Sequence, residues 1–323
     1  MIRLLFLVTL LVLTTPGVTE AQFSPDLSAI TGEALSIELN PAFPAPGETV
    51  TATIDDYASG ITNGSIIWFM NGAVATGTEN QRTVEFVAGS LGSRDVLSVQ
   101  IRNTNGFTQN ASRVISPRYL DIIVEPQTYT PQGYRGRGLP VHDSLVRVTA
   151  LLHDEQGIVN AQNLNYLWRV NNTTLGGGNS RGAFQSSYAV PHGRNHTVTL
   201  EIYDQNNDLL IRRAVNVTVG AVDIRLYEDS PLYGLSYTTL RNPHNFIGNG
   251  VTLRAVPYNL DVRAVNRDLF TEWSINDRTV RSGDDPFEIT LERSGTGVAN
   301  ISFKLRNRVS LLQGGEVRAL LQF

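Results

Sequence analysis

Three tryptophans constrain the fold of this chain more than any other feature, because each stands in the same short pattern. A large apolar residue follows two places after the tryptophan and an asparagine three places after it, at Trp68, Trp168 and Trp273. This alternation is typical of a β-strand that runs into a turn. Because the pattern recurs about every 100 residues, it predicts three repeats of the size of a β-sandwich.

The distribution of residue types around these repeats is that of an all-β protein. Val, Ile, Thr and Tyr crowd short alternating runs such as 49–55 and 197–203, while Gly and Pro gather between the runs. A length of 323 residues allows two or three domains, and the tryptophan spacing selects three. We therefore expect three tandem immunoglobulin-like β-sandwiches. Almost no linker separates the repeats, so the sandwiches should form a stiff rod.

The N-terminus predicts export. A positive charge at Arg3 precedes an apolar run over 4–13 and a small-residue site that ends at Ala21, which is typical of a cleavable signal peptide. An uncleaved membrane anchor is the alternative, for which the run is several residues too short. We expect the following division of the chain: signal peptide 1–21, flexible lead 22–33, and immunoglobulin-like domains 34–117, 118–220 and 221–323.

Charge and cysteine content exclude several classes of function. The net charge is −4 and the charges are scattered singly, which argues against a nucleic-acid binder. Cysteine is absent, so the chain has no disulfide, thiolate metal site, cysteine nucleophile or acyl anchor. No second apolar span of about 20 residues follows the leader. We expect a secreted protein of the cell surface or of a periplasm-like compartment, without a transmembrane span after signal cleavage.

No catalytic or metal-binding motif is evident. His192 and His196 are four residues apart, but Pro191 and Gly193 indicate a loop, whereas a zinc pair at this spacing needs a helix. The acidic pairs 55–56 and 284–285 are interpreted as solvated turn residues, with calcium binding left open. We therefore predict a non-enzymatic protein with no catalytic residue, cofactor or metal site.

Two interpretations of the tryptophans are possible. An exposed row of indoles would be a platform on which sugars stack. Each tryptophan, however, lies in line with the apolar side of its strand, which favours a place in the core of its sandwich. We expect Trp68, Trp168 and Trp273 to be structural core residues.

Tyr-Pro-Gly loops are the best candidates for partner binding. One loop, 125–138, follows the first strand of the second repeat, and 227–236 is its counterpart in the third repeat. Tyrosine offers rigid amphipathic contact area at low entropic cost. The alternative is a spacer that packs these tyrosines against the preceding domain and fixes the angle between domains. The candidate residues are Tyr129, Tyr134, Arg135, Arg137 and Tyr233.

Short motifs add a family resemblance. The stretch 44–54, with Pro44-x-Pro46-Gly47-Glu48, the Trp68-x-x-Asn71-Gly72 strand and turn, and the run 197–204 resemble bacterial immunoglobulin-like domains of the polycystic-kidney-disease (PKD) type. The turn after Trp68 reads Phe-Met-Asn-Gly where those domains typically carry Phe-Gly-Asp-Gly. The layout is also similar to secreted proteins of small-genome bacteria. The resemblance implies placement at the envelope and supplies no activity.

From these observations we expect an exported, non-enzymatic structural or adhesion protein of the bacterial cell envelope or of a surface assembly. Its partner would be an envelope or surface protein or a polysaccharide, and no nucleic acid. One alternative is an array of carbohydrate-binding accessory modules. Another is a subunit of a pilus or secretion machine, which would dock through the edge strands of its sheets.

Overall fold

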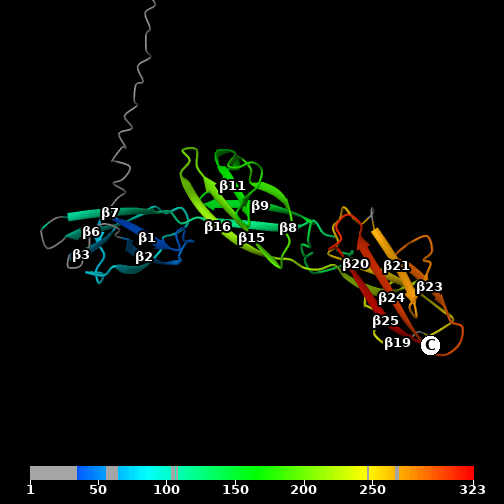
Figure 1. Cartoon of the computed structure of the whole chain (residues 1–323). Coiled ribbons are helices and arrows are strands. Elements are labelled where there is room, and N and C mark those ends of the chain that lie inside the picture. The colour runs from blue at the N-terminus through cyan, green and yellow to red at the C-terminus, as the bar shows by residue number, and fades with distance from the viewer. Residues whose placement is uncertain (1–34, 56–64, 103–105, 107, 246, 266–268) are drawn as a thin grey trace, which may run out of the picture.

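The structure is a computed structural model that describes residues 35–55, 65–102, 106, 108–245, 247–265 and 269–323. These residues form three immunoglobulin-like β-sandwiches in tandem, in an elongated array (Figure 1). The predicted signal peptide and lead, 1–33, lie outside the described residues. The helix content of the described residues is one short 3-10 turn, η2 (Ala161–Asn163). None of their helices has the length and apolarity needed to span a membrane.

The first sandwich packs a three-stranded sheet against a four-stranded one, in the orders β1-β2-β5 and β4-β3-β6-β7. Its alternating strands bury one face each, as in β2, where Val50, Ala52 and Ile54 are buried. The strands are β1 (Ser36–Asn40), β2 (Thr49–Asp55), β3 (Ser65–Met70), β4 (Ala73–Val74), β5 (Thr83–Val87), β6 (Asp95–Arg102) and β7 (Thr108–Ile115).

The second sandwich repeats this arrangement. One sheet has the order β10-β9-β14 with β8 paired to β9, and the other has β12-β11-β15-β16 with β13 paired to β11. The strands are β8 (Tyr119–Pro126), β9 (Leu145–Asp154), β10 (Gly157–Ile158), β11 (Asn165–Val170), β12 (Thr173–Thr174), β13 (Ser180–Arg181), β14 (Gln185–Ala189), β15 (Asn195–Tyr203) and β16 (Leu209–Thr218).

The third sandwich has the sheets β18-β17-β20-β23 and β19-β25-β24-β21-β22. Most of its pairs are antiparallel, and β19 pairs with β25 in parallel. The strands are β17 (Asp223–Ser230), β18 (Gly234–Leu235), β19 (His244–Asn245), β20 (Gly250–Tyr258), β21 (Leu269–Ile275), β22 (Arg278–Val280), β23 (Glu288–Glu292), β24 (Val298–Asn307) and β25 (Gly314–Gln322).

The tryptophans occupy equivalent places in the three sandwiches, on β3, β11 and β21. Their exposed fractions are 0% for Trp68, 3% for Trp168 and 1% for Trp273. Each indole N–H donates to a backbone oxygen of the segment that follows its strand, at 2.9, 2.9 and 3.1 Å. Burying such a ring contributes roughly 4–6 kcal/mol before entropic costs. The indoles are therefore inside the cores and offer no stacking platform.

The asparagine three places after each tryptophan ends the strand in the same way each time. Asn71, Asn171 and Asn276 all have positive φ, as do the residues that follow them, which suits the tight hairpin turn. Each side-chain oxygen also accepts the N–H of a residue on the neighbouring strand, at 2.8, 3.0 and 2.9 Å respectively. The asparagine thus makes the turn and ties it to the sheet.

The two joints between sandwiches both have short connections, residues 116–118 and 219–222. At the first joint, Gly92 donates its N–H to the carbonyl of Pro117 at 3.1 Å, and Phe43 packs against the core of the second sandwich. The second joint has a much larger set of contacts. Val141, which precedes β9 in the chain, even belongs to the core of the third sandwich.

Candidate functional site

The first Tyr-Pro-Gly loop lies at the opposite end of its sandwich from the position that we expected. Strand β8 has eight residues, so at about 3.3 Å per residue it carries the chain away from the first sandwich and toward the third. The loop therefore packs on the following domain, and the expectation of packing against the preceding domain was wrong. The first joint carries neither loop.

Backbone hydrogen bonds attach this loop to the third sandwich. Tyr129 donates its N–H to Leu260 at 2.6 Å and accepts from Asn259 at 2.9 Å, and Thr128 forms a β-bridge with Asp261. The side chain of Asn259 also accepts the N–H of Leu139 at 2.9 Å. The start and the end of the loop are thus both anchored to the same segment after β20, so the loop bridges the second joint.

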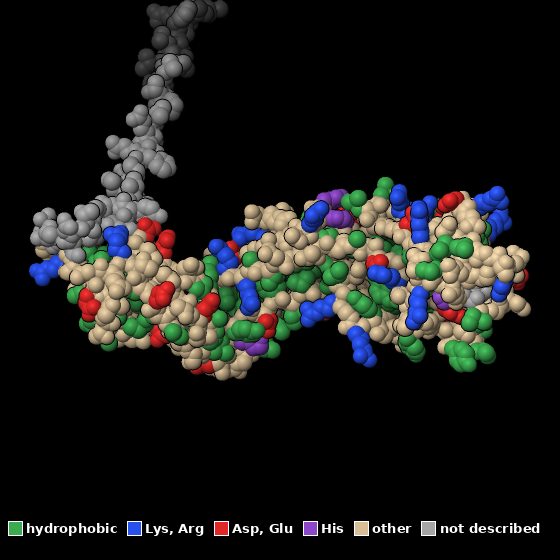
Figure 2. All heavy atoms as spheres, turned by 90° about the horizontal axis from the view of Figure 1, so that it is seen from below, with side chains coloured by type: hydrophobic (Ala, Val, Ile, Leu, Met, Phe, Trp, Pro, Cys, Tyr) green, Lys and Arg blue, Asp and Glu red, His purple; other side chains and the backbone are tan. Residues whose placement is uncertain are grey.

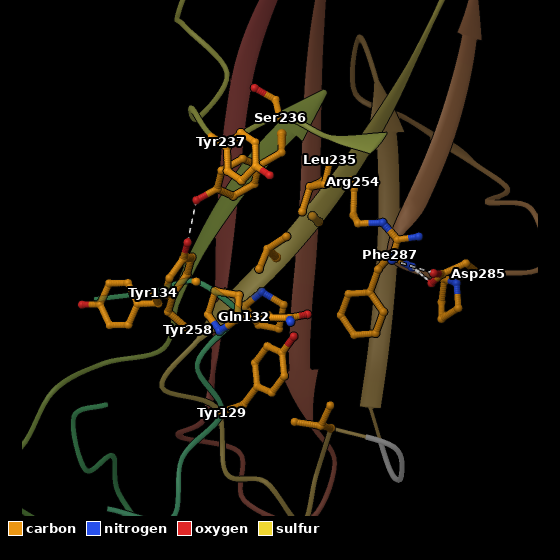
Figure 3. A pocket seen from close by; sticks show the side chains of 18 of the residues that line it. Tyr129, Gln132, Tyr134, Leu235, Ser236, Tyr237, Arg254, Tyr258, Asp285 and Phe287 are labelled. Carbon is orange, nitrogen blue, oxygen red and sulfur yellow. Dashed lines mark hydrogen bonds and ion pairs between the residues drawn. The ribbon is translucent and has the colours of Figure 1, made fainter. Parts of the chain in front are cut away.

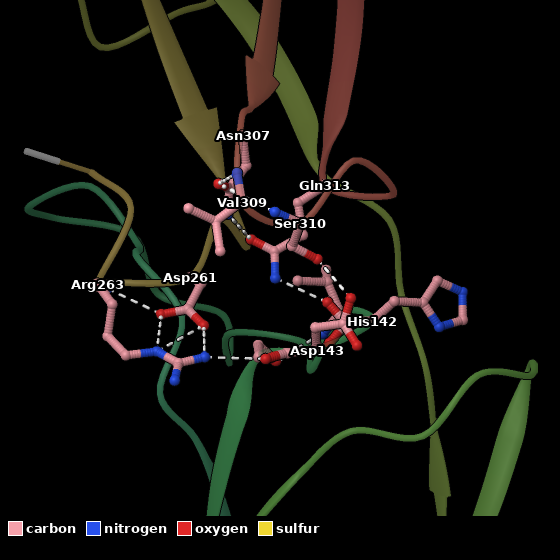
Figure 4. A network of polar contacts seen from close by, with 10 residues as sticks. His142, Asp143, Asp261, Arg263, Asn307, Val309, Ser310 and Gln313 are labelled. Carbon is pink, nitrogen blue, oxygen red and sulfur yellow. Dashed lines mark hydrogen bonds and ion pairs between the residues drawn. The ribbon is translucent and has the colours of Figure 1, made fainter. Parts of the chain in front are cut away.

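A polar network continues this attachment (Figure 4). Asp261 is buried and pairs with Arg263 at 2.5 Å, and Arg263 also donates to the backbone oxygen of Asp143 at 2.9 Å. From the β24–β25 loop, Ser310 donates to the Asp143 carboxylate at 2.5 Å and Gln313 to the carbonyl of His142 at 2.7 Å. Two separate loops of the third sandwich therefore hold the same turn of the second.

Beside this joint, an open groove of about 1600 Å³ lies on the outer face of the β17-β20-β23 sheet (Figure 3). Residues 129–135 close its end at the joint. The segment after β18 forms one side, and residues 285–287 at the start of β23 form the other. The groove is therefore built by two sandwiches at once. Its floor consists of outward-facing side chains of β17 and β20, namely Tyr227, Arg254, Val256 and Tyr258.

The charged centre of the floor is Arg254 on β20. It contacts Asp229 at 3.1 Å on one side and Asp285 and Glu288 at 3.0 and 2.8 Å on the other. Burial by itself lowers the pKa of Arg254, but the three carboxylates outweigh it and raise the pKa above its usual range. The floor thus carries a fixed cation that is surrounded by an excess of acceptor oxygens.

Tyrosines line the end of the groove near the joint. The hydroxyls of Tyr227 and Tyr258 are hydrogen-bonded at 2.5 Å, and the ring of Tyr134 lies edge-on to that of Tyr258 with centroids 5.3 Å apart. Burial, followed by the hydrogen bond with Tyr227, raises the pKa of Tyr258. The phenol therefore remains neutral at physiological pH and can donate or accept a hydrogen bond.

A glycine makes the position of Tyr134 possible. A Cβ atom at Gly136 would lie 2.4 Å from the Tyr134 hydroxyl oxygen, so only glycine allows this ring to fold back over its own loop. Gly133, one residue before the tyrosine, has a φ of +83°, a conformation that glycine adopts without strain. The glycines of the loop thus present Tyr134 to the groove, where it is 47% exposed.

Four of the five predicted partner-binding residues line this one groove: Tyr129, Tyr134, Arg135 and Tyr233. Arg137 is exposed and is not among the lining residues. The two loops, which the sequence placed at separate joints, thus meet on the third sandwich. Segment 234–240 runs back along β17, with a hydrogen bond from Leu240 N–H to the carbonyl of Leu226, and this brings the second loop toward the first.

Sequence reasoning missed the floor of the groove and the fully exposed Tyr237 on its side. The signal for the floor is present in β20, because Arg254, Val256 and Tyr258 alternate with the buried Leu253 and Ala255 and so face outward. What the alternation could not indicate is that another domain would extend a loop over that face.

The remaining polar candidates have local structural partners. His196 lies on β15 and not in a loop, and it is buried with its Nε2 2.6 Å from the Tyr188 hydroxyl. Burial lowers the pKa of His196. His192 is exposed, 3.6 Å from Asp143. Asp56 lies outside the described residues, and the part of the chain that the structure describes has no group of three potential metal ligands.

Charged side chains are dispersed over the face of the array shown in Figure 2, with both signs present and no continuous patch of either. This agrees with the scattered charges of the sequence. The groove is therefore distinguished by its shape and its aromatic lining, not by a long-range field.

No family model and no curated protein match this sequence. Solved structures with a similar arrangement include three N-terminal domains of the Hoc capsid protein of bacteriophage RB49, at 10% identity and TM-score 0.26, covering 90% of this chain and 98% of that one. The central fibronectin-III array of RIM-binding protein has 10% identity, TM-score 0.31 and coverages of 89% and 96%.

Another similar structure is SGBP-B of the Bacteroides ovatus mixed-linkage glucan utilization locus, in complex with a mixed-linkage heptasaccharide. It has 12% identity and TM-score 0.23, and covers 88% of this chain and 70% of that one. These similarities add nothing to what the strand order itself establishes. The chain is a tandem array of immunoglobulin-like β-sandwiches.

Proposed function

We propose that this chain is an exported, non-enzymatic interaction protein of the bacterial cell envelope or of a surface assembly, and that it binds its partner in the groove on the third sandwich. The single observation that carries the proposal is the convergence of two Tyr-rich segments, distant in sequence, on one open groove. Tyr134, Tyr233 and Tyr237 expose 47% of their surface or more there. Exposed aromatic clusters of this kind are typical of binding surfaces.

The chemistry of the lining supports binding over catalysis. The lining residues that the structure describes include no histidine, cysteine or lysine. The hydroxyl of Ser236 donates to the backbone oxygen of Thr238, so no general base is paired with it. A hydrolase or transferase of the common types needs such a pair within hydrogen-bonding distance.

The contacts at the second joint support a role in presenting the groove. Because hydrogen bonds at Tyr129 and Leu139 attach the first Tyr-Pro-Gly loop to the third sandwich, the end of the groove at the joint is formed before any partner arrives. A preformed site avoids the entropic cost of ordering loops on binding.

Binding of the labelled chain 22–323 to isolated bacterial envelopes tests this function. Removing two rings with Tyr134→Ala and Tyr237→Ala should reduce bound protein at least tenfold, which is the loss expected when two exposed anchors of an interface are truncated. The matched control is Tyr119→Ala, because Tyr119 is 43% exposed on the second sandwich outside the groove. Equal binding of the double variant and of the control would contradict the proposal.

A further inference from the structure

We infer that the ligand of the groove is a neutral, hydroxyl-rich glycan chain. This inference rests on the proposed function, since it names the class of partner that the same groove binds. The groove combines two kinds of surface, namely exposed tyrosine rings and the ion cluster of Arg254, in which Arg254 and Asp285 line the groove and Asp229 and Glu288 contact Arg254. The tyrosine rings need a partner with apolar faces, and the ion cluster needs a partner with hydrogen-bonding groups.

The charges at the groove do not favour anionic ligands. Three carboxylates contact Arg254, of which Asp285 lines the groove, and Arg135 is the other cationic side chain among the described lining residues. These five side chains carry three negative charges and two positive ones, so an anionic chain, such as a nucleic acid or an acidic polysaccharide, would find no net attraction there. The favourable groups for these oxygens are neutral donors, and hydroxyls are donors of that kind.

The same floor excludes a purely apolar partner. An amphipathic helix or a lipid surface that covered Arg254, Asp285 and Glu288 would remove their remaining water without offering donors or acceptors in exchange, and burying charged groups in this way is costly. A proline-rich peptide fits aromatic walls, but its prolines have no N–H to donate to the carboxylates.

A glycan chain satisfies both surfaces. The C–H faces of its sugar rings are apolar and can lie flat on tyrosine rings, while the hydroxyls around the ring edges both donate and accept. Tyr134 lies at the end of the groove near the joint, Tyr237 on one side, Asp285 on the other side and Arg254 on the floor (Figure 3). A chain that runs along the groove would therefore stack on the tyrosines at its faces and hydrogen-bond at its edges.

The size of the groove favours a polymer over a single sugar. Its volume of about 1600 Å³ exceeds the roughly 300–1000 Å³ typical of sites for small molecules. The groove is also open, and it lies along the outer face of a sheet, so a long chain can enter and leave without threading. The site therefore suits an internal stretch of a polysaccharide.

The test is affinity electrophoresis and titration calorimetry of the chain 22–323 with a panel of soluble neutral polysaccharides (glucan, mannan, xylan and galactan). We expect at least one to bind.

The carboxymethylated derivative of that same polysaccharide should bind at least tenfold more weakly, because its added carboxylates find no net positive charge at the groove and occupy hydroxyls that would donate to Asp285. Tyr134→Ala with Tyr237→Ala should weaken binding at least tenfold, and Tyr119→Ala should leave it unchanged. Unaltered melting temperatures of the variants show that a loss of binding is not a loss of fold.

Three results would overturn the inference. The first is that no neutral polysaccharide binds with a Kd below about 1 mM, the second is that the carboxymethylated form binds as well as the neutral one, and the third is that poly-L-proline binds and competes. If envelope binding persists in any of these cases and still requires the tyrosines, the proposed function stands and its partner is of another class. If envelope binding is absent as well, the proposed function fails together with the glycan.

Discussion

The two joints of this molecule have connections of similar length and very different contacts. Between the first and second sandwiches, contacts include one backbone hydrogen bond from Gly92 to the connecting segment and the packing of Phe43. Between the second and third, a loop forms backbone hydrogen bonds with the neighbouring domain, and a buried carboxylate, Asp261, orients an arginine that bridges to the second sandwich. Connections of similar length thus leave very different sets of contacts at the two joints.

The difference lies in the loop that follows the first strand of each sandwich. In the second sandwich this loop is long, reaches past the end of its own sheet and builds one end of the groove. In the first sandwich the equivalent segment, 41–48, is shorter and only brings Phe43 to the second core. The contacts across the second joint and the end of the candidate binding site thus come from the same loop, so both should be lost together if that loop is removed.

The largest expected effect is a difference in flexibility. The chain has no natural cysteine, so spin labels can be placed without background at exposed positions. With Ile123→Cys as the common site, the distance distribution to Val87→Cys across the first joint should be about twice as wide as that to Phe270→Cys across the second, since weakly packed domains move relative to one another. Pulsed electron paramagnetic resonance measures both distance distributions. Equal widths would show that the two joints do not differ in flexibility.

A smaller but direct effect should follow from Asp261→Ala. The change removes the carboxylate that accepts hydrogen bonds from Arg263 and so orients this arginine toward Asp143. We expect the free energy of unfolding to fall by about 1.5–3 kcal/mol, as for the loss of hydrogen bonds to a charged group. Calorimetry should then show the second and third sandwiches unfolding in separate transitions. Glu155→Ala is the control, because Glu155 is an exposed carboxylate beside Gly92 at the first joint. A single unchanged transition in the Asp261 variant would argue against coupling.

The smallest effect concerns pH. Burial lowers the pKa of His196 in the second sandwich below its ordinary value of 6.5, so the unfolded state binds the proton more readily than the folded state. The stability that this neutral histidine contributes is present above about pH 6.5 and declines as the pH falls below that value. Between about pH 7.5 and 5.5, thermal unfolding of the second and third sandwiches should shift downward together, while the first sandwich is unaffected.

Substituting the histidine checks the origin of this shift. His196→Gln should flatten the pH dependence of the melting temperature, whatever it does to the stability at neutral pH. His192→Asn is the matched control, because His192 is exposed four residues earlier and should leave the slope unchanged. A slope that persists in the His196 variant would assign the pH dependence to another group.

Local pattern was sufficient to predict the strands and their buried faces. The alternation in 49–55 and 197–203 places every second side chain in a core, and the structure buries Val50, Ala52, Val198 and Leu200 accordingly. The turn after each tryptophan was equally predictable, because asparagine tolerates positive φ. The number and class of the sandwiches follow from the same local signals.

The candidate site was only half predictable. Tyr129, Tyr134, Arg135 and Tyr233 were identified as possible contacts from the composition of their loops, and they do line one groove. Their meeting place was not predictable, since it depends on the direction in which β8 and β17 carry the chain and on the pairing of segment 234–240 with β17. The floor, with Arg254 and Tyr258, was missed for the same reason.

By itself the sequence determined the long alternating strands and the turns after the tryptophans, because side-chain alternation and the φ preferences of asparagine and glycine act within a few residues. The tertiary structure alone decided which surfaces face one another across the second joint. Those contacts form between groups up to 171 positions apart, as between Gln313 and His142, and no periodicity in the sequence encodes such a distance. The aromatic groove exists because of them.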